Sequence, residues 1–155
     1  MSLDEYQHIL SEILTSKDAR IAFLKDKEAF LESKTKDPDT FERLKNLAVF
    51  QIEESAMALI RKRWGTVKAL LLISAEHESI VKPLYFEYAL NNPIAGRVFK
   101  HQYDAMTFIK ELPSNTLDQS LMNHLVHRSK EIKNYLIAEG EPLKSKPKWK
   151  RILKI

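Results

Sequence analysis

The chain has 155 residues, of which 44% are hydrophobic and 30% charged, a balance typical of one globular domain with its own core. Cysteine is absent and only three glycines occur, which excludes disulfides, thiolate catalysis, cysteine-ligated metals and a glycine-rich phosphate loop. The first residues lack the apolar core of a signal peptide, and the most apolar stretch is far shorter than the roughly 20 residues of a membrane span. We therefore expect a cytoplasmic protein without a membrane span.

The net charge of +4 is distributed unevenly. Residues 141–155 contain six lysines and arginines but one glutamate, so they carry +5, and residues 1–140 carry −1. We therefore divide the chain into a nearly neutral helical domain, residues 1–140, and a basic C-terminal tail, residues 141–155.

Helical spacing of apolar residues begins at the amino terminus. Ser2 and Glu5 form a capping-box pattern before an apolar stripe made of Tyr6, Ile9, Leu10, Ile13 and Leu14. Thr15 or Ser16, and then Asp26, can each cap a further short helix, and the next segment, 34–40, is predicted to be a polar linker.

A long helix is predicted from about Thr40. Its apolar side consists of Phe41, Leu44, Ala48, Ile52, Ala56, Leu59, Ile60, Val67 and Leu70. Gly65 costs such a helix about 1 kcal/mol relative to alanine, so we expect a bend or a close helix contact there.

Three further segments complete the predicted fold. Ser74 can cap a helix that Pro83 either kinks or restarts, and another helix runs from about Arg97 to Leu112 with Val98 among its buried residues. A last helix, capped by Ser114 or Asn115, stops at Gly140. The chain is thus predicted to be all-α, a single bundle of about six helices followed by the basic tail.

One residue of the basic run 61–63 in the long helix, Arg63, lies on the apolar side of the helix. Arg61 and Lys62 point toward solvent and Trp64 lies near the edge of the apolar stripe, but Arg63 falls inside it. An unpaired buried charge costs several kcal/mol, so we predict a structural ion pair between Arg63 and Asp104. There are three alternatives. Arg63 could pair with Glu87, it could extend its side chain so that the guanidinium reaches solvent, or it could bind an anion.

The order "AMALIRKRWGTVKALLLIS…LYFEYAL…GRVFKHQYDAMTFIKEL" resembles a group of small, uncharacterised bacterial helical proteins. A looser similarity links residues 15–138 to the N-terminal helical domain of HvfC-type (DUF2063) proteins, partners of iron-dependent peptide-modifying enzymes that have also been labelled DNA-binding. The resemblance implies a helical fold and a partner role, and no catalytic residue. The matching positions are Ala56, Leu59, Lys62, Arg63, Val67, Leu70, Leu71, Tyr85, Tyr88, Asp104, Ala105 and Phe108.

Reactive residues form no recognisable catalytic motif, so we assign no catalytic residue and no cofactor. His124 and His127 share a helix face and could hold a metal, although surface histidines at that spacing are commoner than metal ligands. His101 and Asp104 lie one turn apart without a nucleophile nearby. The aromatic cluster is more often core than ligand site, but Tyr85, Tyr88 and Tyr103 could line a groove.

The basic tail is the clearest candidate for binding a phosphate backbone, an acidic partner or anionic lipid. Its contact residues would be Lys144, Lys146, Lys148, Trp149, Lys150 and Arg151. The alternative is a terminus that only adds solubility. From these features we predict a non-enzymatic partner or scaffold protein that binds another protein or a peptide, such as a peptide-modifying enzyme. The alternatives are a nucleic-acid-binding protein that uses the tail, and a small-ligand or metal-binding protein.

Overall fold

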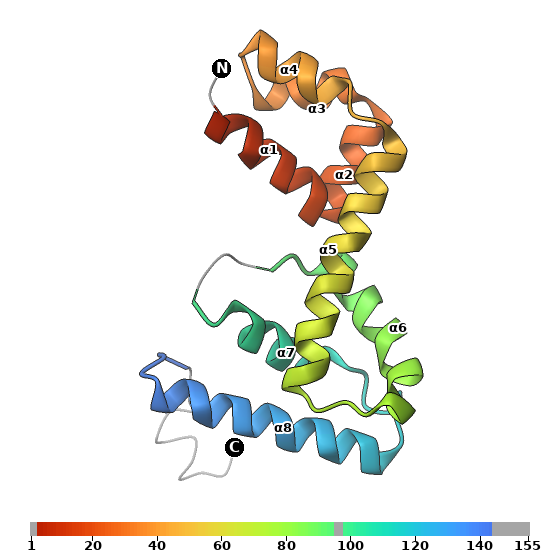
Figure 1. Ribbon diagram of the computed structural model, residues 1–155, viewed down its shortest axis with the longest axis vertical. Helices are drawn as coiled ribbons and strands as arrows, with labels where there is room; N and C mark the ends of the chain where they lie inside the picture. The colour runs from red at the N-terminus through yellow and green to blue at the C-terminus, as the bar shows by residue number, and fades with distance from the viewer. Residues whose placement is uncertain (1–2, 95–97, 144–155) are drawn as a thin grey trace.

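The computed structural model describes residues 3–94 and 98–143 (Figure 1), and these residues form eight helices and no strand. None of these helices combines the length and the apolarity that crossing a membrane would require. The all-α prediction is confirmed, whereas the count of about six helices is wrong. The helices are α1 (Leu3–Thr15), α2 (Lys17–Lys25), α3 (Lys27–Lys34), α4 (Pro38–Lys45), α5 (Val49–Leu70), α6 (Ala75–Asn91), α7 (Lys100–Glu111) and α8 (Gln119–Ala138).

Side-chain caps separate the short helices of the first half. The Ser16 hydroxyl accepts from the Ala19 amide to start α2, and the Asp26 carboxylate does the same for the Ala29 amide of α3. Asp37 caps α4, and Pro38 occupies its first position, where a missing N–H costs nothing. Residues 38–40 of the predicted polar linker therefore belong to α4, so the linker is shorter than predicted.

The predicted long helix is two helices, α4 and α5, interrupted at residues 46–48. Lys27 donates to the backbone carbonyls of Lys45 and Leu47, at 3.2 and 2.6 Å, and so stabilises the end of α4. At the start of α5, the Gln51 side-chain oxygen accepts from the Ala48 amide at 3.3 Å. These contacts replace the backbone hydrogen bonds that a continuous helix would have made.

The helices form two groups, α1–α4 and α6–α8, which α5 connects (Figure 1). Each half of the molecule has its own hydrophobic core. The first core lies among α1–α4 and the start of α5, and consists of Ile9, Ile13, Phe23, Leu31, Leu44 and Ile52. The second lies among the rest of α5 and α6–α8, with Tyr85, Phe108, Leu125 and Leu136 among its largest residues. Within the described residues, α5 alone contributes buried side chains to both cores, so the two halves are joined along this helix.

Several local predictions in the second half are corrected. Val98 is 72% exposed rather than buried, because α7 begins only at Lys100. Asp118, not Ser114 or Asn115, caps α8 by accepting from the Leu121 amide at 2.9 Å. Trp64 lies in the core, only 4% exposed, and not at its edge.

Candidate functional site: a basic pocket between the two halves

The site is organised around the ion pair of Arg63 and Asp104, which joins α5 to α7. Arg63 Nη2 lies 2.7 Å from Asp104 Oδ1, and Arg63 Nε lies 3.3 Å from Oδ2, so the contact is bidentate. Both residues are buried. Burial alone would lower the pKa of the Arg63 guanidinium, but the hydrogen bond and the charge of Asp104 outweigh it and raise that pKa. The guanidinium therefore stays charged inside the protein.

Two tyrosines from α6 complete the surroundings of the Asp104 carboxylate. Tyr85 donates its hydroxyl hydrogen to Oδ2 at 2.6 Å, and Tyr88 donates to Oδ1 at 3.3 Å. Burial raises the pKa of both hydroxyls, and the hydrogen bond to Asp104 and the charge of its carboxylate raise it further, so both remain protonated donors. The carboxylate thus accepts four hydrogen bonds from α5 and α6.

The groove predicted from three tyrosines is wrong for Tyr85, whose side chain is fully buried. Its ring packs edge-on against Phe108 with 5.2 Å between ring centroids, as expected for a core residue. Tyr88 and Tyr103 do line a shallow hollow of about 180 Å³, together with Asn92, Lys100 and parts of α7. The hydroxyl of Tyr103 is held by Glu141 at 3.1 Å.

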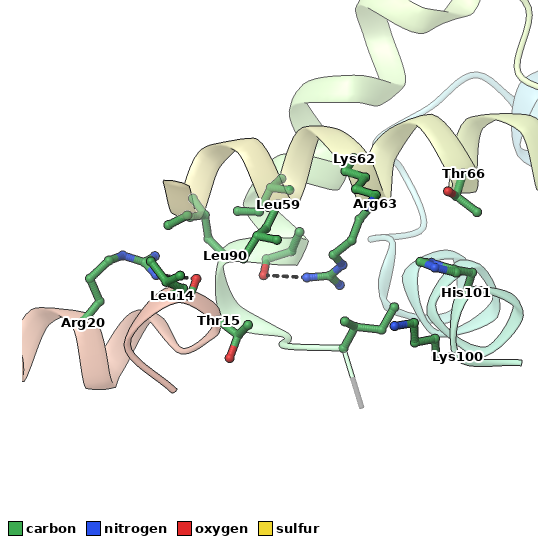
Figure 2. Close-up of a pocket in the computed structure, with 14 residues that line it drawn as sticks. Leu14, Thr15, Arg20, Leu59, Lys62, Arg63, Thr66, Leu90, Lys100 and His101 are labelled. Carbon is green, nitrogen blue, oxygen red and sulfur yellow. Dashed lines mark hydrogen bonds between the residues drawn. The ribbon is translucent and has the colours of Figure 1, made fainter. Parts of the chain in front are cut away.

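Arg63 lines a separate, more enclosed space, and it also contacts backbone carbonyls of α6 and of the segment that follows it. Its Nη1 donates to the Ala89 carbonyl at 3.4 Å (dashed in Figure 2) and its Nη2 donates to the Asn92 carbonyl at 2.9 Å. With the two bonds to Asp104, these contacts use four of the five guanidinium N–H groups. The remaining Nη1 hydrogen has no partner among the described residues.

This space, which we call the basic pocket, lies where the two halves of the molecule meet along α5. It has a volume of about 220 Å³. Figure 2 shows Lys62, Arg63, Lys100 and His101 toward one end, and Leu14, Thr15 and Arg20 toward the other. The apolar part of the wall comes from Leu14, Ala56, Leu59, Ile60, Ala89, Leu90 and Ile94.

The charges of the basic pocket are all of one sign. No aspartate or glutamate is among the described residues that line it. Within the described part of the chain, neither Lys62 nor Lys100 forms an ion pair. Arg20 donates to the Ile13 and Leu14 carbonyls rather than to a carboxylate. Arg63 is paired with Asp104, and Arg20 is close enough to Glu53 to feel its charge. The pocket therefore combines an apolar wall with the uncompensated charges of Lys62 and Lys100.

His101 contributes a polar atom without a partner. Its Nδ1 is buried and makes no hydrogen bond within the described residues. Burial lowers the pKa of the His101 imidazole, and the charges of Lys100, Arg63 and Lys62 lower it further, against an opposing effect of Asp104. The imidazole is therefore neutral at pH 7, and its Nδ1 is an unsatisfied buried polar atom in a residue that lines the pocket.

The two histidines of α8 do not converge. His124 Nε2 lies 3.0 Å from the Leu71 carbonyl oxygen, whereas His127 contacts Glu131 at 2.6 Å. Across residues 3–94 and 98–143, no three potential ligands from histidine, aspartate and glutamate gather closely enough to hold a metal ion. The predicted contact residues of the tail, 144–151, lie outside the described residues.

Sequence reasoning paired Arg63 with Asp104 and treated anion binding by Arg63 as a lesser alternative, but it did not find the pocket. Lys62, Lys100 and His101 come from two helices about 40 residues apart, and nothing in their local sequence marks them as neighbours. The one available signal was the position of Arg63 inside an apolar stripe.

Comparisons of the chain with family models, with curated proteins and with solved structures find no match. The resemblance to the helical domain of HvfC-type proteins therefore stays a prediction, as does the partner role that it implies. The residues of the basic pocket carry the functional argument.

Proposed function

We propose that this chain is a non-enzymatic binding protein and that the basic pocket holds a compact organic carboxylate. The observation that carries the proposal is the lining itself, which contains an apolar wall, no described carboxylate and two lysines, Lys62 and Lys100, without an ion-pair partner among the described residues. Like charges brought together repel one another, so an anion between them lowers the free energy of the assembly. An apolar body attached to that anion would cover the leucines of the wall.

The dimensions of the pocket set the size of the ligand. A volume of about 220 Å³ lies below the roughly 300–1,000 Å³ of pockets for drug-sized molecules, yet above the roughly 150 Å³ cavity that can hold benzene. A benzoate or a medium-chain fatty acid such as octanoate fits this range. The carboxylate would lie near Lys62, Lys100 and the unpaired Nη1 hydrogen of Arg63, and the body against Leu14 and Leu59.

Isothermal titration calorimetry with octanoate tests the proposal. We expect binding at one site per chain, and we expect Lys100→Gln and Lys62→Gln each to weaken it about tenfold, because each removes one charge facing the anion. Lys130→Gln is the matched control, since Lys130 is exposed on α8 and lines none of the hollows described. Octanol, which has the same body without the charge, should bind far more weakly.

Two results would overturn the proposed function. One is the absence of octanoate and benzoate binding at millimolar concentration. The other is binding that Lys100→Gln, Lys62→Gln and Lys130→Gln all leave unchanged, since the anion would then lie elsewhere on the protein.

A further inference from the structure

A second hollow lies along α5 beside the basic pocket. That hollow has a volume of about 440 Å³ and shares Leu14 with the basic pocket. Gln51, Ser55, Leu59, Lys62 and Thr66 of α5 follow one another at spacings of four, four, three and four residues, which places them on one stripe of the helix. The first two line the second hollow and the last three line the basic pocket. We call this stripe of α5, which borders both hollows, the α5 furrow.

The α5 furrow is amphipathic along its whole length. Phe50, at the end away from the basic pocket, is 76% exposed, and Leu59, in the middle, is 40% exposed. Beside them lie polar groups with unused hydrogen-bonding capacity among the described residues, namely the Gln51 amide nitrogen and the hydroxyls of Ser55 and Thr66. The one carboxylate of the second hollow, Glu54, is neutralised by Arg61 at 2.7 Å.

We propose, resting on the proposed function, that the ligand of the basic pocket is the carboxyl-terminal end of a peptide, whose last residues lie along the α5 furrow. Charge complementarity supports this occupant, because a peptide's terminal carboxylate supplies the single negative charge that the basic end lacks. The polar groups of the furrow distinguish a peptide from a fatty acid. A peptide backbone has N–H and C=O groups that must be paired, whereas an acyl chain would leave the Ser55 hydroxyl and the Gln51 amide nitrogen unpaired.

The length of the α5 furrow determines how many peptide residues can lie along it. From Gln51 to Lys62 the helix rises by about 16 Å at about 1.5 Å per residue. An extended peptide at about 3.3 Å per residue spans that distance with about five residues. Apolar side chains of this pentapeptide would contact Leu14 and Leu59 near the carboxylate and Phe50 at the far end.

Fluorescence anisotropy with a labelled pentapeptide of alanine and leucine tests this inference. We use the free acid and the C-terminal amide, each labelled with fluorescein at its amino end. The acid should bind at least tenfold tighter than the amide, octanoate should displace it, and Lys100→Gln should weaken it about tenfold. Ser55→Tyr fills the furrow away from the basic pocket. It should weaken peptide binding at least fivefold while leaving the affinity for octanoate unchanged.

Ala69→Tyr provides the matched control, because Ala69 is exposed near the other end of α5 and lines neither hollow. The inference is overturned, with the proposed function intact, if octanoate binds and responds to Lys100→Gln while the acid and amide peptides bind equally or not at all. It is also overturned if Ser55→Tyr and Ala69→Tyr leave the peptide equally tight. Absence of both octanoate and benzoate binding instead overturns the proposed function itself.

Discussion

Arg63 and Asp104 are 41 residues apart in the sequence, and a 2.7 Å contact between their charged groups holds α5 against α7. Asp104 is satisfied by Arg63 and by two tyrosines, so the buried negative charge is fully compensated. Arg63 also lines the basic pocket. The same guanidinium therefore joins two helices and supplies part of the pocket wall, which couples the stability of the second core to the shape of the site.

Replacing Asp104 by asparagine should be strongly destabilising. The substitution keeps the size of the side chain but leaves the Arg63 charge buried without its counter-ion, so we expect a loss of about 3–5 kcal/mol in the free energy of unfolding. Urea denaturation followed by circular dichroism measures this loss. Glu111→Gln is the control, since Glu111 is exposed on the same helix. Equal midpoints for the two variants would show that the ion pair does not stabilise the protein.

The two tyrosine hydroxyls should contribute unequally to the same network. Tyr85→Phe removes a 2.6 Å hydrogen bond to a carboxylate in the core and should cost about 1.5–3 kcal/mol. Tyr88→Phe removes a longer, 3.3 Å bond from a partly exposed side chain and should cost less. Urea denaturation of both variants gives the comparison, and a larger effect of Tyr88→Phe would contradict the description of Asp104 given above.

The sequence was sufficient to predict contacts that depend on one helix face. Arg63 lies within the apolar stripe of its helix, and this position alone required either a counter-ion or a route to solvent. The caps at Ser16 and Asp26 were likewise readable, because a side chain that accepts from an amide three residues later is a local feature.

Features that depend on distant contacts could not be predicted in this way. The apolar stripe runs from Phe41 through Leu44 to Ile52 without a change of phase, so the sequence predicts one helix. The break between α4 and α5 is stabilised by Lys27, 18 and 20 residues from the carbonyls that it contacts. The basic pocket was missed for the same reason, since its wall combines residues of α1, α2, α5, α6 and α7.

Anion binding to the basic pocket should strengthen as the pH falls. In the free protein, burial and then neighbouring positive charges keep the pKa of His101 below its ordinary value of 6.5, so the imidazole is neutral at neutral pH. A bound carboxylate favours the imidazolium, which raises the pKa of His101 in the complex above that of the free protein. By linkage, affinity is lowest above both pKa values and increases as the pH falls through the higher one.

Octanoate titrations between about pH 7.5 and about pH 5.5 measure this effect. We expect the affinity of the unsubstituted protein to rise several-fold over this interval, and the rise to disappear in His101→Gln. His8→Gln, which changes an exposed histidine of α1, should keep it. An identical pH dependence in His101→Gln would mean that another group takes up the proton.

Two glycines should respond in opposite directions to substitution by alanine. Gly140 follows the end of α8 with φ of +86°, and its amide and that of Glu141 donate to the Ile137 and Leu136 carbonyls, a Schellman cap. Alanine in this left-handed conformation costs about 1–2 kcal/mol. Gly65 lies within α5, and a Cβ added there meets no heavy atom within 4 Å, contrary to the close helix contact predicted from the sequence. Alanine at that position should therefore stabilise the helix by about 1 kcal/mol.

Urea denaturation of Gly65→Ala and Gly140→Ala tests both expectations with one measurement. The midpoint should rise for the first variant and fall for the second, with the slope of the transition unchanged. Because α5 contributes to both cores, a cooperative rise in the Gly65→Ala midpoint would also indicate that the two halves unfold together. Stabilisation by Gly140→Ala would instead show that the left-handed cap does not persist in solution, and the end of α8 would then need a different description.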